Sequence, residues 1–201
     1  MKYIPFLLVF AALFVACRED DLPPSIPQPP APPADEVEVF APCDLSESGE
    51  AGAIKISAEW KATAKCRHFF YQGKKYWTIE LFTCSKYNDN EFRELIFLSH
   101  IPDENPVQMY SLNNDGNSII ENSLNAHYVR LRDDGDVIDD RYDCDTTALN
   151  DYLIIDTWDT INKQIEGRFR VSFVVRQPQR NPDNPEKVKF WKGTFKLPLR
   201  D

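Results

Sequence analysis

The chain has 201 residues, 32 of them Asp or Glu and 23 Lys or Arg, and its formal net charge is −9 at pH 7. This acidic balance argues against nucleic acid and anionic membrane surfaces as partners, because both repel a negatively charged protein. The length suits one ordinary domain with its own hydrophobic core.

Residues 1–16 have the pattern of a secretory signal peptide: Lys2, an apolar run, and then the small residue Ala16. The apolar run is shorter than the roughly 20 residues that span a bilayer, so a transmembrane helix is not expected. Cys17 follows Ala16 directly, and the segment resembles a bacterial lipoprotein signal. The resemblance implies that Cys17 becomes the N-terminus and carries diacylglycerol and palmitate, which would anchor the chain in a membrane.

Residues 17–34 are expected to be a linker. The acids Glu19-Asp20-Asp21 resemble the export signal of surface lipoproteins in the Bacteroidetes, which implies an outer-membrane anchor facing the cell exterior; the alternative is a periplasm-facing anchor. Residues 22–34 hold seven of the chain's fifteen prolines. Proline removes backbone donors, so this stretch is expected to be an extended stalk, reaching roughly 40 Å.

Residues 35–201 are expected to form a single β domain. Aromatic and β-branched residues, alternating apolar and polar positions and polar turns predict successive strands. A hairpin around Gln72-Gly73 comes first, and the strand ranges are 59–71, 75–85, 93–101, 107–112, 127–132, 152–158, 164–176 and 187–199. This pattern favours a mainly all-β fold, either an antiparallel β-sandwich or a lipocalin-like β-barrel. At most one short helix is expected, over residues 117–126.

The last two strands are expected to be long antiparallel partners. Asp159 and Asn162 indicate a turn just before the first of them, because such side chains bond local backbone groups. Gly167 and Gly193 lie inside these strands, where glycine marks a bulge or the close approach of another segment or an aromatic ring.

Four cysteines remain once Cys17 is lipidated: Cys43, Cys66, Cys84 and Cys144. An even number in an oxidising compartment predicts two disulfides, and the spacing does not suit zinc. Cys66 and Cys84 would be several residues out of register in the predicted hairpin, which disfavours their pairing. We therefore expect Cys144 to pair with Cys66 or Cys84; one bridge with two buried thiols is the alternative.

Several short motifs connect the chain to a known group. They are Trp60-Lys61-Ala62, Ala126-His127-Tyr128, Tyr142, the segment 153–169 with Ile165-Glu166-Gly167-Arg168-Phe169, and Gly193-Thr194-Phe195. Together they resemble a family of uncharacterised Bacteroidetes lipoproteins. The resemblance implies a secreted β domain and implies no reaction.

Candidate chemistry is sparse in this sequence. The acids of residues 133–140 are expected to form a solvated turn, with adventitious calcium binding as the alternative. His68, His100 and His127 lie on different predicted strands without ligand spacing. No metal site, cofactor or catalytic residue is therefore expected. Thr146 and Thr160 follow aspartates in a way that resembles the acceptor motif for O-glycosylation in Bacteroidetes.

The favoured function is a non-enzymatic module that binds a glycan, a protein or another envelope component. It predicts exposed aromatic side chains or a groove, although most of the aromatics, including Trp60, Trp77, Trp158 and Trp191, are expected in the core. A lipocalin-like carrier of a small molecule is the alternative and would need an apolar cavity. A hydrolase is less favoured, because it would need converging carboxylates or histidines in a cleft.

Overall fold

The computed structural model describes residues 40–85, 88–113, 123–132 and 134–200, which form strands and no helix. The all-β prediction is therefore confirmed. No helix in the described residues is long and apolar enough to cross a membrane. The strands are β1 (Phe40–Pro42), β2 (Gly49–Lys55), β3 (Ala58–Tyr71), β4 (Lys74–Ser85), β5 (Asn88–Pro102), β6 (Met109–Asn113), β7 (Ser123–Leu131), β8 (Ile138–Cys144), β9 (Tyr152–Asp159), β10 (Gln164–Val175) and β11 (Lys187–Pro198).

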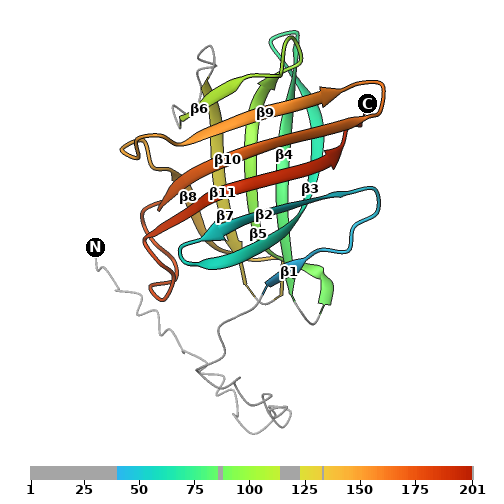
Figure 1. The fold of residues 1–201 in the computed structure, drawn as a ribbon. Coiled ribbons are helices and arrows are strands. Elements are labelled where there is room, and N and C mark those ends of the chain that lie inside the picture. The colour runs from blue at the N-terminus through green and yellow to red at the C-terminus, as the bar shows by residue number, and fades with distance from the viewer. Residues whose placement is uncertain (1–39, 86–87, 114–122, 133, 201) are drawn as a thin grey trace, which may run out of the picture. The chain divides into compact units, whose positions relative to one another are not determined.

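The strands form one sheet that closes on itself. The pairings run β2–β3–β4–β5–β7–β8–β10–β11 and return to β2, while β9 and β6 provide a second path from β10 to β7. Every pairing is antiparallel except β6–β7, and β1 adds to β4. In Figure 1, β9, β10, β11 and β2 cross in front of β7, β5, β4 and β3. The domain is thus barrel-like, with two crossing layers joined at their corners.

Three strands were not predicted, and part of the segment considered for a short helix is a strand. β1 has only three residues, β2 (GEAGAIK) is rich in glycine and alanine, and β8 (IDDRYDC) is rich in acids, so each lacks the residues typical of strands. Ser123–Ala126, the end of that segment, belongs to β7, where it pairs with β5 and β6. Residues 117–122 of the segment lie outside the described residues.

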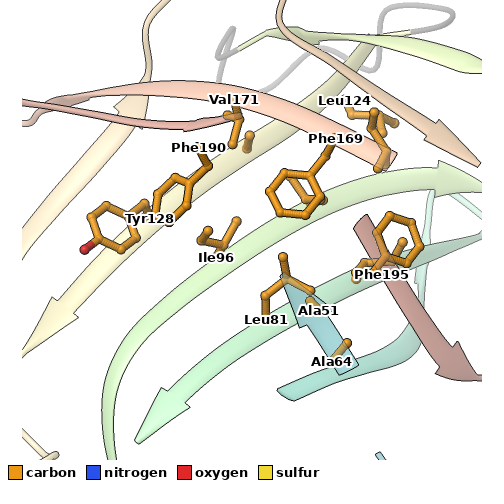
Figure 2. Close-up of a cluster of buried hydrophobic side chains, with 14 of the residues drawn as sticks. Ala51, Ala64, Leu81, Ile96, Leu124, Tyr128, Phe169, Val171, Phe190 and Phe195 are labelled. Atoms are coloured by element: carbon orange, nitrogen blue, oxygen red, sulfur yellow. The ribbon is translucent and has the colours of Figure 1, made fainter. Parts of the chain in front are cut away.

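The main core fills the space between the two layers. Figure 2 shows side chains from the rear strands, among them Leu81, Ile96 and Tyr128, lying near Phe169 and Phe190 from the front strands. All five are fully buried. The predicted alternation is confirmed, because Trp77, Ile79 and Leu81 on β4 and Phe169, Val171 and Phe173 on β10 all belong to this core.

A second, smaller core lies on the opposite face of β4. Phe82 and Cys84 point away from the main core and pack with Cys43, Leu45, Phe92 and Leu95. Strand geometry requires this separation, because successive side chains point to opposite faces. The residues after β1 therefore cover part of the outer face of the sheet.

Candidate functional site

The β3–β4 hairpin ends in a group of aromatic side chains that we call the aromatic end: His68, Phe69, Phe70, Tyr71, Tyr76 and His100. The chain reverses at Gln72 and Gly73, whose φ angles of 48° and 77° are those of a type I′ turn. This turn matches the strand twist, so pairing continues to the last pair, Tyr71 and Lys74. β5 lies alongside β4 at this end and brings in His100.

Three rings of the aromatic end are open to solvent, those of His68, Phe70 and Tyr71. Phe70 is 69% exposed and Tyr71 39% exposed, and they point to opposite faces of β3. Phe69 stacks on Tyr76 with ring centroids 5.8 Å apart, and Tyr76 is buried. The exposed rings therefore sit beside rings that the fold holds in place.

His100 connects the aromatic end to the neighbouring strand β7. Its ring lies edge-on to Phe69 at 5.2 Å, and Asn125 Nδ2 donates to its Nδ1 at 3.2 Å, which leaves the ring proton on Nε2. Burial lowers the pKa of His100, and the nearby His127 lowers it further. The imidazole is therefore neutral near pH 7 and can donate one hydrogen bond.

Trp77 and Trp158 lie on the face of the hairpin opposite Phe69 and Tyr76. Their ring centroids are 5.3 Å apart, and His68 lies 5.3 Å from Trp77. Trp77 Nε1 donates to Asp103 Oδ1 at 2.6 Å, and Lys75 Nζ lies 4.4 Å above the Trp77 ring. This end thus combines fixed aromatic faces with polar groups at their edges, an arrangement suited to stacking on a ligand.

The binding hypothesis predicted exposed aromatic side chains without saying which, and the structure places them at the tip of the β3–β4 hairpin. Trp60 and Trp77 are in the core as expected, whereas Trp191 is 36% exposed. The missed signal is Phe69-Phe70-Tyr71 directly before Gln72-Gly73. Three consecutive aromatics at a hairpin tip cannot share one face, so at least one must point away from the core.

The cysteine pairing differs from our expectation. Cys43 and Cys84 form a disulfide, with Cα atoms 5.0 Å apart, whereas Cys66 and Cys144 are free and buried. The expected pairing of Cys144 with Cys66 or Cys84, and the expected second bridge, are therefore wrong. Cys84 faces the small outer core, while Cys66 and Cys144 face the main core, so the sheet lies between them.

The two free thiols have little nucleophilic character. Burial raises the pKa of Cys66. Burial, reinforced by the acids Asp151, Asp145 and Asp143, raises the pKa of Cys144 to about 12. Because the thiolate is the reactive form, both groups are expected to be inert in the folded protein.

The acidic segment before β8 is only partly a solvated turn. Asp134 Oδ1 accepts from the backbone of Asp136 and Val137 at the exposed turn, as predicted. Asp139 and Asp140, however, are buried in β8, at 8% and 1% exposure, which corrects the prediction of a solvated turn for them. The last two acids of the segment therefore belong to the strand β8, which the sequence pattern did not predict.

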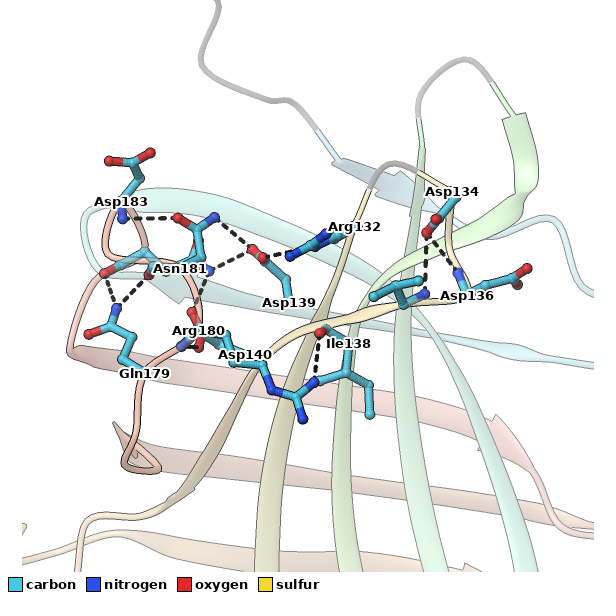
Figure 3. Close-up of polar contacts among 12 residues, drawn as sticks. Arg132, Asp134, Asp136, Ile138, Asp139, Asp140, Gln179, Arg180, Asn181 and Asp183 are labelled. Atoms are coloured by element: carbon cyan, nitrogen blue, oxygen red, sulfur yellow. Dashed lines mark hydrogen bonds and ion pairs between the residues drawn. The ribbon is translucent and has the colours of Figure 1, made fainter. Parts of the chain in front are cut away.

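The loop between β10 and β11 supplies the hydrogen bonds that these buried acids need. Asn184 Nδ2 donates to Asp139 and to Asp140, at 2.7 Å each, and Asn181 Nδ2 donates to Asp139 at 3.0 Å. Figure 3 shows this network, with Arg132 beside Asp139 and the Arg180 backbone amide on Asp140. Every one of these contacts is internal, so the network has a structural role.

A buried carboxylate also lies at one end of the main core. Glu94 is fully buried and forms an ion pair with Lys55. Trp60 Nε1 donates to Glu94 Oε2 at 2.8 Å, and the Tyr128 hydroxyl donates to Oε1. No local pattern in the sequence indicates this network, because a single Glu among 32 acidic residues is not distinguished by its neighbours.

The other predicted site residues are dispersed. Thr146 and Thr160 are both exposed in turns, and the turn at Thr160 is held as predicted by Asp159, whose Oδ1 accepts from the backbone of Ile161 and Asn162 at 2.8 Å each. Cys17 lies outside the described residues. Among those residues, no group of three or more His, Cys, Asp or Glu side chains could hold a metal ion.

Comparison with known proteins gives no further identification. No protein-family model, no curated protein and no solved structure matches the chain.

Proposed function

We propose that the protein is a non-enzymatic binding module of the cell envelope, anchored through lipid on Cys17, and that its aromatic end binds a glycan. The observation that carries this proposal is the exposure of Phe70 and Tyr71, at 69% and 39%, at the tip of a regular hairpin. Leaving two large rings in water at a well-formed turn forgoes hydrophobic stabilisation, which is consistent with a ligand covering them.

The chemistry of the aromatic end suits a sugar better than a purely apolar ligand. A pyranose ring has an apolar face that stacks on aromatic rings, and hydroxyls at its edge that need hydrogen-bond partners. His100 Nε2 and the nearby Gln72 side chain supply such partners next to Tyr71. The buried neighbours of these rings reduce the ordering cost of binding.

The interior of the domain gives no comparable support to a carrier function. Large side chains such as Tyr128, Phe169, Phe173 and Phe190 fill the space between the layers. A lipocalin-like carrier would need an apolar cavity in this place. A surface site is therefore the better supported of the two hypotheses.

The test is a glycan array, with mucin glycans included, probed with the chain from residue 17 onward carrying Cys17→Ser. We expect saturable binding that Phe70→Ala or Tyr71→Ala weakens at least tenfold. Ile161→Ala is the matched control, because Ile161 is 89% exposed in the turn between β9 and β10. Absence of glycan binding, or equal loss with Ile161→Ala, would remove the proposal.

A further inference from the structure

The outer face of β5, β7 and β8 carries a groove of about 520 Å³, separate from the aromatic end, which we call the outer groove. Strand register places its side chains in rows across the three strands. Phe97, His127 and Asp143 form one row, Leu95, Val129 and Arg141 the next, and Leu131 with Ile138 the third. Directly paired residues of antiparallel strands point to the same face, so these side chains line one continuous surface.

Most of the outer groove is apolar, and it continues a surface that is covered elsewhere. Leu95 also packs against the small outer core, where Cys43 and Leu45 cover Phe82. On the same face of the sheet, the apolar surface continues from Leu95 over Val129, Leu131 and Ile138, which are all partly exposed. The apolar strip is thus covered over β4 and open over β7 and β8.

The charges lining the groove sum to a positive value in a chain of net charge −9. Asp143 is neutralised by Arg176, whose Nε and Nη2 donate to its two oxygens at 2.9 and 2.6 Å. His127 Nδ1 lies 3.4 Å from the same carboxylate. No described residue forms an ion pair with the Arg141 guanidinium, which lines the groove beside Val129.

We propose that the outer groove binds a free single-chain anionic amphiphile of the fatty-acid type. Its hydrocarbon chain lies over Leu95, Val129 and Leu131, and its carboxylate pairs with Arg141. Guanidinium groups bind carboxylates with two parallel hydrogen bonds, and the unpaired Arg141 has this capacity available. The volume of the groove falls within the range of small-molecule sites.

The test is calorimetric titration of the Cys17→Ser chain with dodecanoate below its micellar concentration, with dodecanol and dodecyltrimethylammonium as comparisons. We expect dodecanoate to bind most tightly. Arg141→Gln should weaken dodecanoate at least tenfold and leave dodecanol unchanged, while Leu131→Asn should weaken both. Arg168→Gln is the control, because Arg168 is an exposed arginine on β10 paired with Asp156. Circular dichroism establishes that each variant is folded.

Three outcomes would overturn the proposal: no dodecanoate binding, equal or tighter binding of dodecyltrimethylammonium, or an unchanged affinity in Arg141→Gln. If dodecanoate does not bind but the protein sediments with anionic phospholipid vesicles, the ligand is a membrane surface and the proposal is overturned. Phe70→Ala should leave dodecanoate binding unchanged, which separates this site from the aromatic end.

Discussion

The ring of Phe195 occupies the space that a side chain on Gly167 would need. A β-carbon built on Gly167 would lie 2.3 Å from Phe195 Cζ and 2.4 Å from the Ile154 carbonyl oxygen. The relationship is reciprocal along β10 and β11: Gly167 pairs with Phe195, and Gly193 pairs with Phe169, whose ring lies 2.6 Å from the corresponding position. The predicted close approach of an aromatic ring is thereby confirmed at both glycines.

Gly167→Ala should destabilise the domain by about 1–3 kcal/mol, because the Phe195 ring must leave its position and a backbone oxygen cannot move aside. Urea unfolding measures the change. Gly52→Ala is the matched control in β2, since the nearest atom to its β-carbon would be the Trp60 carbonyl oxygen at 3.6 Å, an ordinary contact. Equal stabilities for the two variants would contradict this account of the pairing.

Loss of the Cys43–Cys84 bridge should cost about 4 kcal/mol, because the bridge closes a loop between residues 41 positions apart. The Cys43→Ser/Cys84→Ser double variant, compared with wild type in urea, gives the value. Cys66→Ala/Cys144→Ala retains the bridge and is the control for loss of two buried sulfurs.

Alkylation followed by mass spectrometry tests the same pairing independently. In denaturant without reductant, Cys66 and Cys144 should be labelled and Cys43 and Cys84 should remain joined. In the folded protein, none of the four should react quickly. Recovery of any peptide that links Cys144 to another cysteine would refute the pairing.

Glu94→Leu should destabilise the domain by about 3–5 kcal/mol, because it leaves Lys55 without its carboxylate in a largely buried place. Adding Lys55→Met should recover part of this loss, since the pair would then be replaced by apolar groups. Urea unfolding of the two single variants and the double variant gives the coupling energy. Additive effects would show that the two side chains do not interact.

Stability should decrease as the pH falls below about 6.5, in part through His100. Its pKa is lowered in the folded state, so in this window the unfolded chain binds more protons than the folded one, and stability is lost as the pH falls. His100→Asn should flatten the pH dependence between pH 5.5 and 7, and asparagine tolerates the positive φ of 74° at this position. His68→Asn, at the same end, is the comparison; an equal flattening there would exclude His100 as the cause.

Local patterns predicted the strands whose side chains alternate strongly, and they failed where tertiary contacts decide. Phe169, Val171 and Phe173 were placed on one face correctly, because period-2 burial leaves a direct trace in the sequence. β2 and β8 were missed because their Gly, Ala and Asp residues are stabilised only by neighbours: β3 and β11 flank β2, and Asn184 satisfies the acids of β8.

The alternation of side chains along β4 already argues against a bridge between Cys84 and Cys144. Counting along β4 from Trp77, Ile79 and Leu81 places Cys84 on the opposite face. A partner for Cys84 therefore had to come from a segment outside the main core, as Cys43 does. The aromatic end was recognisable as a hairpin from Gln72-Gly73, and the three aromatics before that turn indicate an exposed ring. Which ring is exposed depends on where the neighbouring strands end, as β2 does opposite Ala64.

The Cys43–Cys84 bridge also determines how the domain would bear a mechanical load applied through its N-terminal side. β1 has three residues and pairs only with β4, so a pull alone would peel its few hydrogen bonds away one after another. The covalent bond at Cys43 transfers the force to β4, which is held along both edges by the long registers of β3 and β5. Residues 44–83 form a loop that the bridge closes, so they cannot be drawn out, and the force enters the sheet at Cys84, near the end of β4.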